Sequence, residues 1–273
     1  MRREYRIVSN ESSLNPLQDF SGIVLGDEGC IYKAMDEGWM VTADKALKNG
    51  LAVRYLTPVV PECYVDKLYQ RIKIMSAEAI IKVTFNDYGL LSLCRPLIER
   101  GQIIPVLGRI LSRSVCECPW HKELLKYEEP ELAAVVAANT LKHQAKIDIF
   151  NTYNIQEFEL NQQEVSELKK YGFDNIKLTT YQSNRIIAVG RICYSARWYE
   201  MVLPECIKDR RCSNKLYIKL DKMWGKKRLM YEEPPEYMKG YYNKLYVTGN
   251  IVYEELGAEE NLNLLRGFDT VIL

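Results

Sequence analysis

The chain has 273 residues, of which 47% are hydrophobic and 27% are charged, a composition typical of a globular protein and not of a disordered one. Its formal net charge of +1 gives no overall electrostatic signal for nucleic acid or for a strongly acidic partner. No run of about 18 apolar residues occurs, and no apolar segment follows the basic N-terminus. The sequence therefore predicts neither a membrane span nor a signal peptide, and it favours a cytoplasmic protein.

In the first 110 residues, short apolar runs alternate with amphipathic stretches. The expected strands cover residues 5–9, 22–25, 51–56, 79–84 and 103–107. The expected helices cover residues 31–48, 64–75 and 90–100. Consecutive strand–helix pairs of this length are typical of a parallel sheet with buried strands.

The second half of the chain continues the alternation less regularly. Helices are expected at 131–146 and 162–171, and strands at 147–150, 158–160, 175–179, 185–190, 216–220, 227–231, 244–253 and 269–273. The pattern predicts an α/β fold of the (β/α)-barrel type, with irregular or incomplete closure left open. An open doubly wound sheet is the alternative, but no G-x-G-x-x-G follows the first strand. Without an internal repeat or a linker, a single domain over residues 1–273 is expected.

Cysteines carry the strongest chemical signal. Residues 192–212 hold Cys193, Cys206 and Cys212 beside four basic side chains, and Cys30 follows the second expected strand. Without a secretion signal, metal or redox chemistry is favoured over disulfides, although buried core cysteines are common. Thiolates near cations have lowered pKa values and are good ligands. By ligand type, four thiolates suit zinc or an iron–sulfur cluster equally.

The remaining cysteines are weaker candidates. Cys116 and Cys118 lie close to His121 and form a candidate zinc half-site. Cys94 lies within an apolar helical run and is expected in the core. Cys63 stays undecided, because it is able to replace one of the four ligands.

Polar residues also follow two expected strands, where a barrel places its active site. Asn86 and Asp87 either contact a substrate or cap the next helix, because both residue types accept from free backbone N–H groups. Arg109 and Arg113 share one helical face, and they either clamp a carboxylate or phosphate or form a solvated basic surface.

Four segments in the order FNDYGLL, LGRILSRS, NTYN and ICYSARWY together resemble peptidase family U32, in particular its short UbiV-like branch. The resemblance spans residues 22–212. It implies an α/β-barrel with a [4Fe–4S] cluster held by one early and three late cysteines. Cys30 matches the early ligand. Trp198 stands where relatives carry a cysteine, so the cluster is either completed by Cys193, Cys206 and Cys212 or lost.

The resemblance implies an iron–sulfur protein of oxygen-independent hydroxylation, or of a related redox modification. It would act with a paralogous U32 protein as a heterodimer, on a small molecule such as a quinone precursor or on an RNA base. The residues that would line the substrate or partner side of the barrel mouth are Asn86, Asp87, Arg109 and Arg113.

Two alternative functions stay open. A U32-type peptidase is one, although neither histidine has a recognisable nucleophile beside it and no H-E-x-x-H or G-x-S-x-G motif occurs. A non-catalytic accessory subunit, stabilised by zinc or by disulfides, is the other.

Overall fold

The computed structural model of the chain describes residues 1–7, 19–112, 141, 143–161, 175–203, 206, 212, 214–218, 244–257, 265 and 268–273. The chain divides into two compact units. The first, here called the barrel unit, comprises Met1–Arg113, Asn139–Gln182 and Asn261–Leu273. The second, here called the sheet unit, comprises Ser114–Ala138 and Ser183–Glu260.

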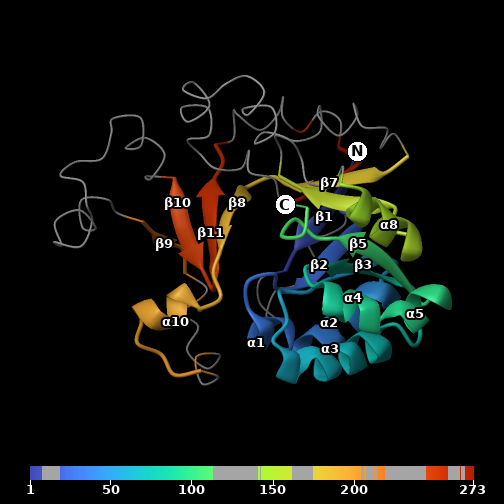
Figure 1. Ribbon diagram of the computed structural model, residues 1–273, viewed down its shortest axis with the longest axis horizontal. Helices are drawn as coiled ribbons and strands as arrows, with labels where there is room; N and C mark the ends of the chain where they lie inside the picture. Colours follow the sequence, from blue (N-terminus) through green and yellow to red (C-terminus); the bar gives the residue numbers. More distant parts are fainter. Residues whose placement is uncertain are drawn as a thin grey trace. The chain divides into compact units, whose positions relative to one another are not determined.

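Within the described residues, eight parallel strands of the barrel unit close into a barrel in the order β1-β12-β7-β6-β5-β4-β3-β2 (Figure 1). The strands are β1 (Arg2–Arg6), β2 (Gly22–Gly26), β3 (Ala52–Leu56), β4 (Ile81–Phe85), β5 (Ile103–Leu107), β6 (Glu157–Leu160), β7 (Lys177–Tyr181) and β12 (Thr270–Ile272). The helices are α1 (Ile31–Ala34), α2 (Gly38–Lys48), α3 (Glu62–Met75), α4 (Tyr88–Leu93), α5 (Arg95–Glu99) and α8 (Gln144–Thr152). The predicted (β/α)-barrel is confirmed, and it is closed.

Successive side chains of each strand point alternately outward, into an apolar core, and inward, to the barrel interior. On β3, Val53 and Tyr55 belong to the large hydrophobic cluster that also contains helix residues, whereas Arg54 points to the opposite face. A second, small cluster joins Val24, Leu56, Tyr181 and Ile272 of the strands. The interior is therefore only partly apolar, and charged side chains fill much of the remainder.

Local sequence sets the helix boundaries of the barrel unit. The expected helix 90–100 is two helices, because Pro96 lies in the first turn of α5 and Cys94 ends one helix and begins the next. The expected helix 31–48 is also divided, at a turn in which the Asp36 carboxylate accepts a 2.9 Å hydrogen bond from the Gly38 amide. Short-range turn chemistry thus interrupts two amphipathic patterns that look continuous.

The expected strand 147–150 was wrong, because these residues lie in α8. An apolar run of four residues does not distinguish a strand from a buried helical turn. Phe150 is buried on the helix, and its ring lies 4.8 Å from that of Phe158 on β6. The expected segments 162–171 and 227–231 lie outside the described residues.

In its described part, the sheet unit has a four-stranded sheet in the order β8-β11-β10-β9, antiparallel throughout. Its elements are β8 (Asn184–Val189), α10 (Tyr194–Trp198), β9 (Leu216–Tyr217), β10 (Leu245–Thr248) and β11 (Ile251–Glu255). The expected strand 244–253 is a hairpin, whose turn places Gly249 first with a φ of 64°. Glycine at that position is typical of a type II′ turn.

Among the helices that the structure describes, none combines the length and apolarity needed to cross a bilayer.

Candidate functional site

Cys30 lies at the end of the turn that joins β2 to α1, at the carboxyl end of the barrel. The turn starts at Gly26, whose φ is 87° and where an added Cβ would lie 2.3 Å from the Leu56 carbonyl oxygen of β3. The Asp27 carboxylate then accepts a 2.8 Å hydrogen bond from the Gly29 amide. Cys30 occupies the N-cap of α1, and its carbonyl accepts from the Ala34 amide at 3.0 Å. Backbone and side-chain contacts therefore fix the turn that presents this thiol.

The environment of Cys30 favours the neutral thiol. Burial, followed by the negative charge of Asp27, raises the pKa of Cys30 to about 12. A metal that binds this sulfur must therefore displace its proton.

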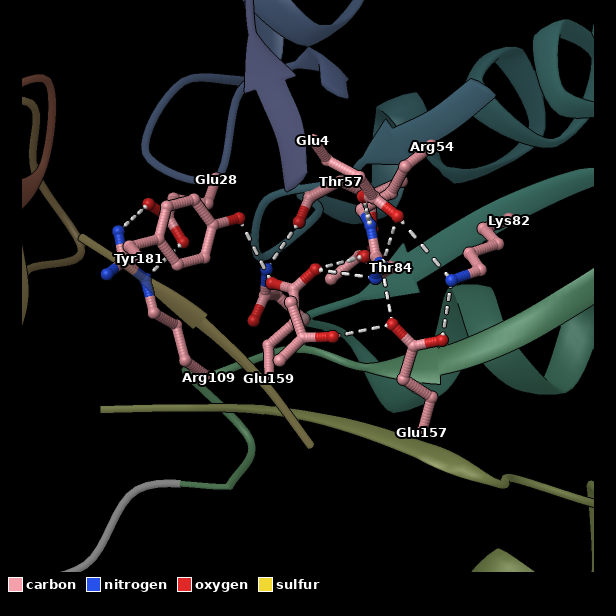
Figure 2. Close-up of polar contacts among 12 residues, drawn as sticks. Glu4, Glu28, Arg54, Thr57, Lys82, Thr84, Arg109, Glu157, Glu159 and Tyr181 are labelled. Atoms are coloured by element: carbon pink, nitrogen blue, oxygen red, sulfur yellow. Dashed lines mark hydrogen bonds and ion pairs between the residues drawn. The ribbon is translucent and has the colours of Figure 1, made fainter. Parts of the chain in front are cut away.

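Glu28, two residues before Cys30, is the centre of a buried charge cluster (Figure 2). Its carboxylate accepts from Arg109 Nε at 2.9 Å and from a second Arg109 nitrogen, and from Arg6 Nη1 at 3.2 Å. The Arg109 guanidinium lies 3.7 Å from the centroid of the Tyr181 ring. Both Glu28 and Arg109 have fully buried side chains. The cluster thus joins β1, β7 and the segments that follow β2 and β5.

Asn86 and Asp87, predicted at the end of β4, both have structural partners. The Asn86 amide donates to the Thr57 carbonyl at 2.8 Å and accepts from the Ile110 amide at 3.0 Å. Asp87 is the N-cap of α4 and accepts from the Leu90 amide at 2.9 Å. Of the two alternatives for Asp87, the structure shows the helix cap. Arg113 lies outside the described residues.

Deeper in the barrel, Arg54 binds three glutamates (Figure 2). Its Nε donates to Glu4 at 2.6 Å and its Nη1 to Glu159 at 3.1 Å, while Nη2 pairs with Glu157. Lys82 lies 2.8 Å from Glu157 and 3.5 Å from Glu4. Although burial by itself would lower it, these carboxylates raise the pKa of Arg54 well above its usual value.

Two of these carboxyls have opposite pKa shifts. Burial alone would raise the pKa of Glu157, but the positive charges of Arg54 and Lys82 outweigh it and lower that pKa to about 2. Burial dominates at Glu159 and raises its pKa, despite Arg54 and the Thr84 hydroxyl. The Tyr181 hydroxyl lies 3.1 Å from Glu159 Oε2 and connects this interior group to the cluster around Glu28.

The three late cysteines all belong to the sheet unit. Cys193 is the N-cap of α10, and its sulfur accepts from the Ala196 amide at 3.3 Å. Cys206 and Cys212 are buried. Trp198, at the end of α10, has 71% of its surface exposed. None of these cysteines forms a disulfide, and neither does Cys30 of the barrel unit.

The described part of the chain contains no group of three or more His, Cys, Asp or Glu side chains placed to hold a metal ion. Cys63 is an exposed free thiol on α3, and Cys94 is buried in the core as predicted. Cys116, Cys118 and His121 lie outside the described residues.

The interior charge network was not predicted from the sequence. The signal was present, because Arg54, Lys82 and Glu159 lie within expected strands, and Glu4 and Glu157 each directly precede one. A charged residue that replaces an apolar one inside a buried parallel strand needs a partner, since an unpaired buried charge is costly.

No protein-family model matches the chain, and no curated protein matches it significantly.

Proposed function

We propose that the protein binds an iron–sulfur cluster and acts in an oxygen-independent hydroxylation or a related redox modification. The observation that carries the proposal is the position of Cys30, which ends the short turn after the carboxyl end of β2 in a closed (β/α)-barrel. Barrels of this type have their active sites at that end. The resemblance of residues 22–212 to family U32 supplies the reaction class.

The donor set suits such a cluster by its chemistry. None of Cys30, Cys193, Cys206 and Cys212 forms a disulfide, and [4Fe–4S] clusters are held by four cysteine thiolates. The same four ligands suit zinc, which is the alternative cofactor. When bound, the cluster would supply electron transfer. The chain would supply the ligand positions, and the burial of Cys206 and Cys212 would keep water from their sulfurs.

Residues at the barrel mouth are proposed to shape the substrate or partner side. Asn86 links the ends of β3 and β4 to the segment after β5, and Asp87 fixes the start of α4. Arg109 is held by Glu28 and Tyr181, so its role is to form the wall of the mouth. Arg113 belongs to the same proposed set. The substrate would be a small molecule or an RNA base.

Iron content tests the proposal. Purified without oxygen, the chain should be brown and carry about four irons per chain. Cys193→Ser should lose the iron, whereas Cys63→Ser, which changes an exposed cysteine on α3, should keep it. A colourless chain with zinc or without metal would contradict the proposal and favour an accessory subunit. Cleavage of a peptide panel that survives loss of all four cysteines would favour a peptidase.

The partner is a separate part of the proposal, drawn from the same resemblance. Co-expression with a paralogous protein of the U32 type should give a heterodimer that retains more iron than the chain alone. Equal iron in both preparations, with no complex on gel filtration, would contradict the proposed partner. It would not contradict the proposed cluster.

A further inference from the structure

Glu28 connects the turn that carries Cys30 to distant strands of the barrel. Its carboxylate is bound by Arg6 at the end of β1 and by Arg109, two residues after β5. Arg109 contributes two of its nitrogens to the same carboxylate, in the bidentate arrangement that restricts a guanidinium most strongly. Since only Gly29 separates Glu28 from Cys30, these contacts restrain the position of the thiol.

A buried ion pair of this kind is poorly explained by stability alone. Both side chains are fully buried, and the cost of removing two charges from water often equals or exceeds the attraction between them. Packing an apolar pair of similar volume would be at least as favourable. What the ion pair adds is directional geometry, because a guanidinium fork donates two hydrogen bonds to a carboxylate in only a few orientations.

Tyr181 restricts the two arginines further. Its ring lies 3.7 Å from the Arg109 guanidinium and 5.7 Å from that of Arg6. Among the other contacts of the turn, Gly26 abuts the neighbouring strand, and Asp27 accepts from Gly29 and lies 3.9 Å from Arg6 of β1. The contact with Arg109, after β5, is made by Glu28. Through Glu28, the turn after β2 is therefore also held by residues of β1 and of the segment after β5.

We propose that Glu28, held by Arg6 and Arg109, is a positioning residue that fixes the β2–α1 turn and thereby the thiol of Cys30. The role of Cys30 as a cluster ligand rests on the proposed function. The restraint on the turn does not, because it follows from contacts within the barrel unit. The two parts are therefore measured separately.

Alkylation of the full-length, metal-free chain measures the restraint. Cys30 and Cys94 are followed at the peptide level by mass spectrometry, because Cys94 is a fully buried thiol of the same unit and reports its unfolding. Glu28→Gln keeps the side-chain size and removes the charge. Glu99→Gln is the matched control, because it breaks an Arg–Glu pair that is exposed on α5. Arg109→Lys keeps the charge but loses the fork.

We expect Glu28→Gln to label Cys30 about tenfold faster than wild type, because a buried charge pair is broken, with no change at Cys94. Arg109→Lys should give an intermediate rate, and Glu99→Gln the wild-type rate. Unchanged labelling of Cys30 in a folded Glu28→Gln chain would overturn the proposal. If Glu28→Gln accelerates the labelling of Cys30 and Cys94 equally, Arg109→Lys becomes the deciding variant. Equal acceleration of both thiols in Arg109→Lys would also overturn the proposal.

Iron separates this inference from the proposed function. If the wild-type chain binds a cluster, Glu28→Gln should retain less iron than Glu99→Gln after identical reconstitution. A wild-type chain without iron would end the cluster proposal, while the labelling ratio of Cys30 to Cys94 would still decide the positioning role.

Discussion

Two glutamates on the same inward face of β6 show how strongly position controls charge inside the barrel. Glu157 contacts both Arg54 and Lys82, and their positive charges overcome the effect of burial. Glu159 is fully buried and contacts one cation, Arg54, together with the hydroxyls of Thr84 and Tyr181. Burial therefore prevails at Glu159 and raises its pKa. A displacement of two residues along one strand therefore reverses the direction of the pKa shift.

Replacing each glutamate by glutamine should give opposite results. Glu157→Gln leaves Arg54 and Lys82 with too little negative charge, so it should lower the free energy of unfolding at pH 7 by about 3 to 5 kcal/mol. Glu159→Gln should be neutral or stabilising. Arg54 and Thr84 both donate to Oε1, which the amide retains, and the new NH2 group faces a tyrosine hydroxyl that is able to accept. Denaturant titration of both variants measures this, and an equal loss in both would contradict the assignment.

At the scale of elements, the end of β2 is fixed by close approach of two backbones. Gly26 has a φ of 87°, and an added Cβ would lie 2.3 Å from the carbonyl oxygen of Leu56. Gly50, after α2, has a similar φ of 75° with no atom within 4 Å of an added Cβ. The two glycines therefore share a positive φ and differ in steric contact.

Alanine substitutions separate these two effects. Gly50→Ala should cost about 1 kcal/mol of unfolding free energy, because it strains the left-handed backbone only. Gly26→Ala should cost about 2 kcal/mol more, because the backbone of β2 or β3 must move. Thermal and denaturant unfolding of the pair checks the difference. Equal losses in the two variants would show that the contact with Leu56 does not constrain the turn.

Elements were predictable where the sequence pattern has one interpretation. The strand expected at 103–107 matches β5 residue for residue, because an apolar run between turn residues defines both ends. The strand expected at 147–150 failed because its four residues fit a helical face equally well. The continuous helix expected at 90–100 failed at Pro96, which starts a new helix there. Boundaries set by a single turn residue are thus the least predictable from periodicity.

The positions of Cys30, Asn86 and Arg109 after strands were predictable from the sequence, but their partners were not. Cys30, Asn86 and Arg109 follow strands, and a barrel brings the carboxyl ends of its strands together. That Arg109 binds Glu28 follows only from the closed barrel, since 81 positions separate the two residues in the chain. Local patterns carry no information about such a pair, whose members are neighbours only after the barrel has closed.

At the scale of the whole molecule, the charged interior should make the stability of the barrel unit depend on pH. The pKa of Glu157 is about 2 in the folded chain, below its usual value of 4.5. A lowered pKa stabilises the folded state above the unfolded value, and this contribution is lost as the pH falls from about 4.5 towards 2. Glu159 has the opposite sign, because its raised pKa favours the folded state at low pH and loses that contribution as the pH rises.

The free energy of unfolding should therefore fall by on the order of 3 kcal/mol from Glu157 alone as the pH is lowered through this window. In Glu157→Gln, this contribution should be absent, so that the difference between wild type and variant disappears near pH 2. Urea titrations at several pH values between 2 and 7 measure both curves, with Glu99→Gln as the exposed control. If the two curves stay parallel over the window, the buried pairing of Glu157 with Arg54 and Lys82 is not the source of the acid sensitivity.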